Sequence, residues 1–248
     1  MDQKQKKPVI SIVLIGLNEE KLVGTCMQSL VNQNIDKPYE VIFVDGGSTD
    51  GTVDIVKRYT DRLRLRIIIH KGQGIGDSRE EGFRATSAPI IASTDSDVIL
   101  PEDWIKKIYY HIKSHPQCIG IVGPYTLYPS NRALRYLFLM VIRLADLFGK
   151  IISGMYLFRG MNFAIRKEVW GKTGGFEKSI SALEDVDLAV KASKFGTICY
   201  VWSLIILTSP RRFQRKFFKT LWYRLLVYYH RVFLRDYRYG EWEQIRDI

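Results

Sequence analysis

The stretch IIASTDSDVILPEDW, residues 90–104, combines the pattern of a buried strand with a close pair of acids. It opens on an apolar run, and Asp95 and Asp97 follow with one residue between them. Two carboxylates this close repel each other and cost several kcal/mol when they leave water without partners. The folded chain must therefore compensate this charge.

The chain before this stretch alternates between strand-like and helix-like patterns. The strand-like runs are VISIVLIGL (9–17), YEVIFVD (39–45), LRLRIIIH (63–70) and the opening stretch itself. The helical patterns lie at 22–31, 52–59, 77–87 and 101–114. Alternation with near-continuous apolar strands is typical of a parallel sheet covered on both faces. We therefore predict an α/β fold with a mostly parallel central sheet flanked by helices.

Several residues suggest where the helices begin and end. Asn18 is expected to cap the first helix, and one residue of the turn 48–50 to cap the second. Ser181 and Glu184 fit a capping box that opens a later helix, which Gly196 would end.

The carboxyl ends of parallel strands meet at one edge of a sheet, where ligands bind. Asp45 ends the second run and Asp95 the fourth, so both should lie on one rim with the loop after the first strand. Asp95 and Asp97 suit Mg²⁺ or Mn²⁺, which prefer one or two carboxylates together with phosphate oxygens and water. The alternative is an exposed turn in which Asp97 caps the helix that starts near Pro101.

A second acidic cluster contains a candidate general base. Asp185 falls in the first turn of the helix that Glu184 opens, where a carboxylate can point into a cleft and accept a proton. The glycine-rich run HKGQGIG (70–76) lacks the pattern of a phosphate-binding loop. Arg79, just after it, could reach a phosphate or a base; the alternative is a surface arginine.

Composition sets broad limits on the type of protein. The 248 residues fit one large α/β domain as easily as two small ones, and 46% hydrophobic with 25% charged residues predict a folded chain. The N-terminal arm MDQKQKKP lacks the apolar core of a signal peptide. Since no window of about eighteen uncharged apolar residues occurs, we expect no transmembrane helix.

The three cysteines, Cys26, Cys118 and Cys199, are far apart and have apolar neighbours. This pattern predicts reduced core cysteines in a cytosolic protein. The four histidines show no zinc-type spacing with them, so we expect no structural zinc site.

The net charge of +11 favours an anionic partner: a nucleotide diphosphate, a nucleic acid or an acidic lipid surface. Residues 211–238 carry nine Lys or Arg against one Asp. Residues 132–158 form an amphipathic pattern with a broad apolar face, too polar to span a bilayer but suited to its surface. The alternatives for both segments are packing on the sheet and contact with another subunit.

Four segments together resemble the large inverting glycosyltransferase family 2, with its nucleotide-sugar-binding GT-A fold. They are SIVLIGLNEE, EVIFVDGGSTDGT, ASTDSDV and GGFEKSISALEDVDLAVKASKFG, in the family's order, within a match that runs from about Ile10 to Arg212. Leu17 stands where the family often has tyrosine. Ile99 stands where dolichyl-phosphate mannose synthases commonly have glutamine, so we do not assign that narrower activity.

The resemblance implies roles for individual residues. Asp95 and Asp97 look like the family's DxD pair, with Asp97 as the direct metal ligand, and Asp185 looks like the general base. Leu17, Glu19 and Asp45 would line the pocket for the base and ribose, and Arg211 and Arg212 would close over the diphosphate. The full set predicted to bind the donor is Leu17, Glu19, Asp45, Arg79, Asp95, Ser96, Glu184, Arg211 and Arg212.

We therefore expect a metal-dependent inverting glycosyltransferase that moves a sugar from a UDP- or GDP-type donor to a hydroxyl or lipid-phosphate acceptor. Residues 1–210 would form the catalytic domain and 211–248 a basic aromatic extension. The protein would be cytoplasmic and peripheral on the inner face of the membrane, with no nucleic-acid partner.

Other functional classes make different demands on the sequence. A haloacid-dehalogenase-type phosphatase should carry its acid pair near the first strand. A nucleotidyltransferase that forms sugar nucleotides should have a glycine- and basic-rich loop after that strand, where LNEEK is acidic. A non-enzymatic nucleic-acid-binding protein would use the basic tail, and its binding would fall steeply with salt and ignore the loss of Asp97.

Overall fold

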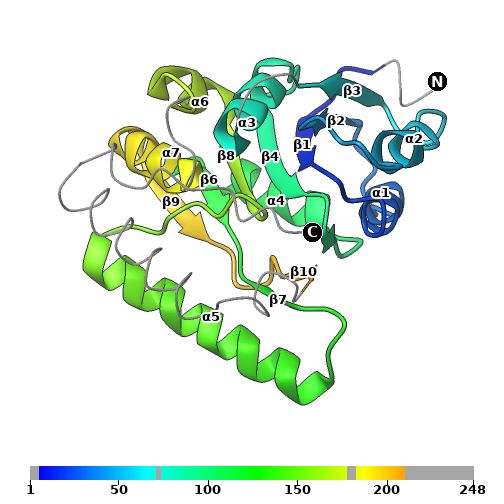
Figure 1. Cartoon of the computed structure of the whole chain (residues 1–248). Helices are drawn as coiled ribbons and strands as arrows, with labels where there is room; N and C mark the ends of the chain where they lie inside the picture. Colours follow the sequence, from blue (N-terminus) through cyan, green and yellow to red (C-terminus); the bar gives the residue numbers. More distant parts are fainter. Residues whose placement is uncertain (1–5, 71–73, 178–182, 210–248) are drawn as a thin grey trace.

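A seven-stranded sheet forms the centre of the molecule (Figure 1). This computed structural model describes residues 6–70, 74–177 and 183–209. The strands of the large sheet are β1 Ile10–Gly16, β2 Tyr39–Asp45, β3 Leu65–Ile69, β4 Ile90–Asp95, β6 Cys118–Val122, β8 Phe163–Arg166 and β9 Thr197–Tyr200. Their order is β3-β2-β1-β4-β8-β6-β9, in which β1 to β4 are parallel and β8 runs antiparallel to both neighbours. The predicted α/β class is confirmed.

A smaller three-stranded sheet lies beside the large one. It joins β5 (Val98–Ile99), β10 (Ile206–Thr208) and β7 (Tyr125–Leu127) in the order β5-β10-β7. Because β5 follows the acid pair directly, this sheet holds the chain as it leaves Asp97.

Helices cover both faces of the large sheet (Figure 1). They are α1 Val23–Val31, α2 Thr52–Lys57, α3 Ile75–Arg84, α4 Trp104–Ser114, α5 Arg132–Ser153, α6 Lys167–Thr173 and α7 Glu184–Ala192, with a short 3₁₀ turn η1 at Ser193–Phe195. Side chains of β1 alternate between the two faces. Ile12 and Leu14 join a core with Trp104 of α4, whereas Val13 joins a second core with Phe83 of α3.

Three predictions about helix ends need correction. Asn18 does not cap α1, because that helix begins at Val23 after Leu22, and Asn18 instead adopts a left-handed conformation with φ 54°. The capping box is also wrong. Leu183 is the N-cap of α7, with φ 59° and no side-chain hydrogen bond, so Glu184 is the first helical residue. The N-cap of α2 is Gly51 and not a residue of the turn 48–50, although Asp50 accepts a hydrogen bond at 3.0 Å from the backbone N–H of Thr52.

The prediction of reduced cysteines is wrong for two of the three. Cys118 and Cys199 form a disulfide between the adjacent parallel strands β6 and β9. Their separation of 81 residues hides this proximity, which exists only in the folded sheet. Cys26 is a free, buried thiol, and burial raises its pKa far above the ordinary value.

Helix α5 confirms the predicted amphipathic helix but is shorter than residues 132–158. It starts at Arg132, where Asn131 caps it by accepting a hydrogen bond from the N–H of Leu134, and it ends at Ser153 before the left-handed Gly154. None of the helices in the described part of the chain is long and apolar enough to cross a membrane.

Two helical glycines give a matched test of the packing between α3 and the sheet. A Cβ at Gly82 would lie 2.5 Å from Val13 Cγ1 and 2.9 Å from Val44 Cγ2, whereas a Cβ at Gly171 of α6 would meet open space. Gly171→Ala should raise the free energy of unfolding by up to about 1 kcal/mol, the gain in helix propensity. Gly82→Ala should lower it by about 1–3 kcal/mol, because overpacking outweighs propensity. Urea denaturation measures both; equal effects would contradict the close approach of α3 to β1 and β2.

Candidate active site

The carboxyl edge of the parallel strands carries the predicted acids. In the sheet register, Gly16 at the end of β1 pairs with Asp45 of β2, and Ile15 pairs with Asp95 of β4. Strand order changes direction at β1, which is where open α/β sheets form their ligand crevice. Asp45 and Asp95 therefore flank β1 on the same rim, as predicted from the sequence.

Asp45 fixes the turn that follows β2. Its buried carboxylate accepts hydrogen bonds from the N–H groups of Gly47 (3.0 Å) and Ser48 (2.9 Å), and from the Ser48 hydroxyl at 2.5 Å. This turn is joined to the loop after β1, since Asn18 Oδ1 accepts from the Thr49 N–H at 2.8 Å. A carboxylate that accepts three hydrogen bonds from its own loop fixes this turn at the edge of the sheet.

Leu17 and Glu19, the other two residues predicted to line the pocket for the base and ribose, lie in the loop after β1. Both are half-buried. The Glu19 N–H donates to Thr52 Oγ1 at 2.7 Å, and a Cβ on Gly46 would touch the Leu17 side chain at 3.5 Å. The structure therefore brings Leu17, Glu19 and Asp45 together in two neighbouring loops.

The side chain of Arg79 is 3% exposed and occupies the centre of the site. Its Nη2 donates to Asp95 Oδ1 at 2.8 Å and its Nε to Glu184 Oε1 at 2.9 Å. Its Nη1 donates to the Gly160 carbonyl oxygen at 2.8 Å and also to the Ser93 hydroxyl. The alternative of a surface arginine is wrong: the guanidinium is surrounded by protein groups.

These contacts supply a counter-charge to Asp95, one member of the acid pair. Burial alone would lower the pKa of Arg79, but Asp95 and Glu184 raise it above its ordinary value, so the guanidinium stays protonated. For Glu184, burial and the neighbouring Asp185 raise the pKa of the carboxyl group, while Arg79 opposes that rise. A single buried cation thus holds the carboxyl end of β4 next to the start of α7.

Residues 95–97 form a buried loop between β4 and β5. Asp95, Ser96 and Asp97 are each 6% exposed or less, so the alternative of an exposed turn is wrong. The Ser96 N–H donates to the Ile15 carbonyl at 3.1 Å, and a Cβ on Gly16 would lie 2.7 Å from Ser96 Oγ. Nor does Asp97 cap a helix near Pro101, since α4 begins at Trp104.

Asp185, the predicted general base, lies in the first turn of α7 and is half-buried. Its Oδ2 accepts from the Gly160 N–H at 2.6 Å, and its Oδ1 from the Val186 N–H at 2.8 Å. Asp185 is also among the charges that raise the pKa of Arg79. Because Gly160 contacts Arg79 through its carbonyl and Asp185 through its N–H, it joins the acid pair to the candidate base.

Sequence reasoning missed two residues that shape this site. A Cβ on Gly160 would lie 2.3 Å from Arg79 Nη2, and only its glycine identity hinted at such crowding. Glu80 is buried, and its Oε2 accepts from the Phe176 N–H at 2.9 Å, which anchors the segment after the Gly174–Gly175 turn. Of the predicted residues, Arg211 and Arg212 lie outside the described part of the chain, as does the proposed extension 211–248.

Both the sequence and the fold of this chain are similar to those of known proteins. The model of Glycosyl transferase family 2 matches residues 11–176, more than half of the chain. The chain is 28% identical over 214 residues to chondroitin synthase from Escherichia coli, a match that covers 79% of this chain and 29% of the synthase. This chain therefore spans less than a third of that relative.

Two solved structures share the GT-A architecture. Mannosyltransferase PcManGT from Pyrobaculum calidifontis, in complex with GDP-Man and Mn²⁺, superposes with a TM-score of 0.72 at 21% identity, covering 94% of this chain and 66% of its own. TarS from S. aureus, in complex with UDP-GlcNAc, gives a TM-score of 0.64 at 19% identity, covering 81% of this chain and 58% of its own. At these identities the likeness shows the fold, and it confirms the predicted architecture.

Removal of Arg79 tests its role as the buried counter-charge. Arg79→Ala should lower the free energy of unfolding at neutral pH by about 3–5 kcal/mol, because it leaves buried carboxylates uncompensated. The loss should shrink as pH falls, because protonation neutralises the carboxylates left without a counter-charge and so removes the cost of burying them. The exposed Arg62 is the control, and Arg62→Ala should cost no more than about 0.5 kcal/mol. A pH-independent loss for Arg79→Ala would contradict the charge argument.

Proposed function

Because the chain belongs to glycosyl transferase family 2, we propose that it is a metal-dependent inverting glycosyltransferase. It moves a sugar from a nucleoside-diphosphate donor of the UDP or GDP type to a hydroxyl or lipid-phosphate acceptor. One observation carries this proposal: Asp45 and Asp95 share one edge of the sheet, and Arg79 and Gly160 link Asp95 to Asp185. Neighbours of this fold that hold GDP-Man and UDP-GlcNAc support the donor class.

The acid pair fits a hard divalent cation such as Mg²⁺ or Mn²⁺. Asp95 and Asp97 offer only carboxylate oxygens, the donors these ions prefer. Arg79 binds Asp95 Oδ1, so part of the Asp95 charge is already compensated and Asp97 is the direct ligand in this proposal. When bound, the ion neutralises the charge that develops on the leaving nucleoside diphosphate.

Asp185 accepts the proton of an acceptor hydroxyl as that oxygen attacks the anomeric carbon from the side opposite the leaving group. The Gly160 N–H orients the carboxylate by holding Oδ2, and each oxygen keeps a further lone pair for the acceptor. A single displacement of this kind inverts the anomeric configuration. An acceptor phosphate is already ionised, so it needs this base less than a hydroxyl does.

Calorimetry with UDP, GDP, CMP and dTDP, with and without Mn²⁺, tests the donor site. We expect one diphosphate to bind in the presence of metal and the Asp97→Ala variant to lose that binding. Asp54→Ala removes an exposed carboxylate on α2 and should bind like the wild type. If the wild type binds none of these nucleotides under any metal condition, the transferase proposal is wrong.

Asp185→Asn distinguishes the two acceptor classes. For a hydroxyl acceptor, kcat should fall by about 10²–10⁴-fold, the usual contribution of a general base. For a phosphate acceptor, the loss should stay within about tenfold, because that nucleophile is already deprotonated. Initial rates with each acceptor measure the difference, and donor affinity serves as the control for folding. If kcat is unchanged with both acceptor classes, Asp185 is not the base.

We also propose that α5 rests on an anionic membrane surface. An ordinary surface helix packs its apolar face on the protein and exposes its polar face, whereas α5 exposes most of its apolar face. Two polar residues near its middle face the protein: Arg143 donates to the Trp202 carbonyl at 2.9 Å, and Asp146 accepts from Tyr200 at 2.8 Å and pairs with Arg159. Leu139 is its buried residue, and Phe138 and Ile142 also pack against the core, whereas ten other large apolar side chains are exposed.

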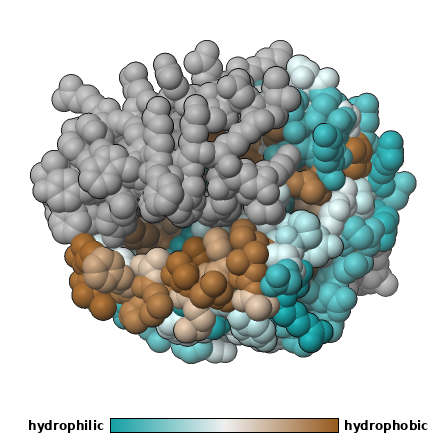
Figure 2. Space-filling view, turned by 60° about the horizontal axis from the view of Figure 1, so that its bottom comes forward, coloured by the Kyte–Doolittle hydropathy of each residue, from teal (hydrophilic) through white to brown (hydrophobic). Residues whose placement is uncertain are grey.

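The outward face forms a hydrophobic patch, visible in brown in Figure 2. Its exposed members are Leu134, Tyr136, Leu137, Met140, Val141, Leu144, Leu147, Phe148, Ile151 and Ile152. The exposed Arg132 and Lys150 lie at its two ends, and such basic residues are attracted to acidic headgroups by about 1 kcal/mol each. An apolar face with basic ends is the design of a helix that lies in a membrane interface.

Vesicle sedimentation tests this contact. The wild type should sediment with vesicles that contain phosphatidylglycerol, and Leu137→Glu with Phe148→Glu should weaken binding by about tenfold or more. Ile69→Glu adds the same charge to an exposed residue of β3 and should bind like the wild type. Equal binding by all three proteins would show that α5 is not the membrane contact. Its apolar face would then be left for another occupant, such as the C-terminal segment of the chain or a second copy.

A further inference from the structure

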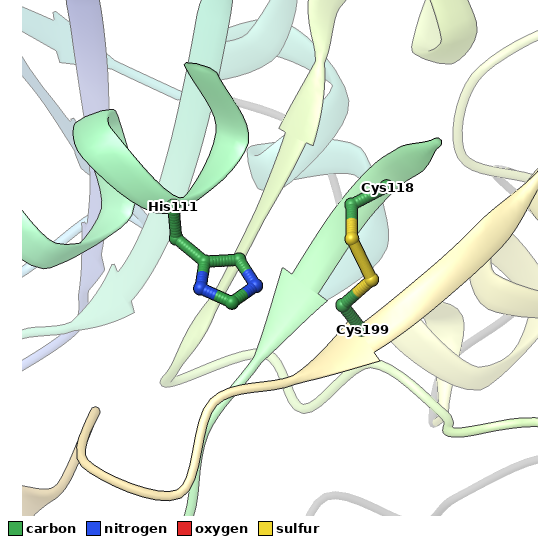
Figure 3. A group of neighbouring side chains, drawn as sticks. All are labelled: His111, Cys118 and Cys199. Atoms are coloured by element: carbon green, nitrogen blue, oxygen red, sulfur yellow. A yellow bond between two sulfur atoms is a disulfide. The ribbon is translucent and has the colours of Figure 1, made fainter. Parts of the chain in front are cut away.

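We propose that Cys118, Cys199 and His111 form a binding site for zinc or a similar transition metal when the disulfide is reduced. Figure 3 shows the imidazole of His111, in the last turn of α4, facing the sulfur pair of β6 and β9. One ligand atom from each of the three residues lies within 4.8 Å of the other two. This inference does not depend on the transferase proposal.

The geometry suits a tetrahedral ion. Zinc bonds of about 2.3 Å to sulfur and 2.0–2.1 Å to nitrogen place neighbouring ligand atoms about 3.5–3.8 Å apart. The three atoms of the cluster lie within 4.8 Å of one another, so shifts of about 1 Å bring them to this spacing. The Cα atoms of Cys118 and Cys199 are 5.7 Å apart, so side-chain rotation alone can separate the two sulfurs once their bond is broken. Water completes the fourth position.

His111 is held in the orientation that the site needs. The ring of His115 stacks on it, with centroids 4.2 Å apart and planes at 19°. His115 Nδ1 lies 2.9 Å from the His111 carbonyl oxygen and donates to it, which fixes the second ring. Burial, with His115 nearby, lowers the pKa of His111 and favours the neutral imidazole that binds metals.

The cluster is separate from the donor site. Cys118 is the first residue of β6, which runs parallel to β4 because both are antiparallel to β8. It therefore lies at the edge of the sheet opposite the one that carries Asp45 and Asp95. Cys118 is buried, but Cys199 and His111 are half-exposed, so an ion can reach the site from solvent.

The disulfide and the metal site are alternative states of the same residues. A dithiol reductant converts the Cys118–Cys199 disulfide to two thiols and leaves as its own disulfide, a transfer of two electrons and two protons. Binding of Zn²⁺ then releases the two thiol protons, because the thiolate is the ligand. In either state the pair ties β6 to β9, and the metal adds α4 through His111.

Cobalt titration of the full chain tests the proposal. Reduced wild type, kept free of oxygen, should develop a near-ultraviolet thiolate-to-cobalt charge-transfer band together with the visible bands of tetrahedral Co²⁺, and Zn²⁺ should displace them. Oxidised wild type should show neither. Carboxylate-bound Co²⁺ has no thiolate band, so metal at Asp97 does not contribute. Alkylation of free thiols followed by mass measurement confirms each redox state.

Variants assign the signal to these residues. Cys118→Ser and Cys199→Ser should abolish the thiolate band, and His111→Ala should weaken Co²⁺ binding by more than about tenfold. Cys26→Ala removes the remaining cysteine and should leave the band unchanged. If the reduced wild type shows no thiolate band, or if the band survives in Cys118→Ser or Cys199→Ser, the proposal is wrong and the pair is a structural disulfide only. The wild-type comparison decides the matter even where a variant fails to fold.

Discussion

The buried guanidinium of Arg79 is the interaction on which the site depends. It brings Asp95, at the end of β4, and Glu184, at the start of α7, to within 2.8–2.9 Å of one cation. Two carboxylates at this depth need such a partner, because a buried charge without one costs several kcal/mol. The protein therefore compensates Asp95, one of the two acids in residues 90–104, before any ligand arrives.

Close backbone contacts complete what Arg79 begins. Gly160 lies against the guanidinium so closely that no side chain fits, and its N–H holds the carboxylate of Asp185. On the other side of β1, Asp45 holds its own turn through three hydrogen bonds. The acids of this edge thus divide into those that build the crevice and those, Asp97 and Asp185, that the proposed chemistry uses. Rigid placement of this kind lowers the cost of ordering the site when substrate binds.

The sequence predicted what depends on local pattern and on general rules of sheets. Apolar runs located the strands, and the rule for parallel sheets placed Asp45 and Asp95 on one rim, where the structure has them. It could not predict partners that meet only in the folded chain. Arg79 and Glu184 are 105 residues apart, and Cys118 pairs with Cys199 because β6 and β9 become neighbours. Periodicity likewise revealed the two faces of α5 but not which of them faces outward.

The orientation of α5 connects the proposed membrane surface to the proposed chemistry. Asp146 of α5 pairs with the half-buried Arg159. The guanidinium of Arg159 also lies over the ring of Tyr125, 4.8 Å from the ring centroid. The next residue is Gly160, which contacts both Arg79 and Asp185. The helix and the candidate base are therefore anchored by adjacent residues of one short segment. If α5 rests on a membrane as proposed, this short segment connects the membrane-facing helix to the candidate base.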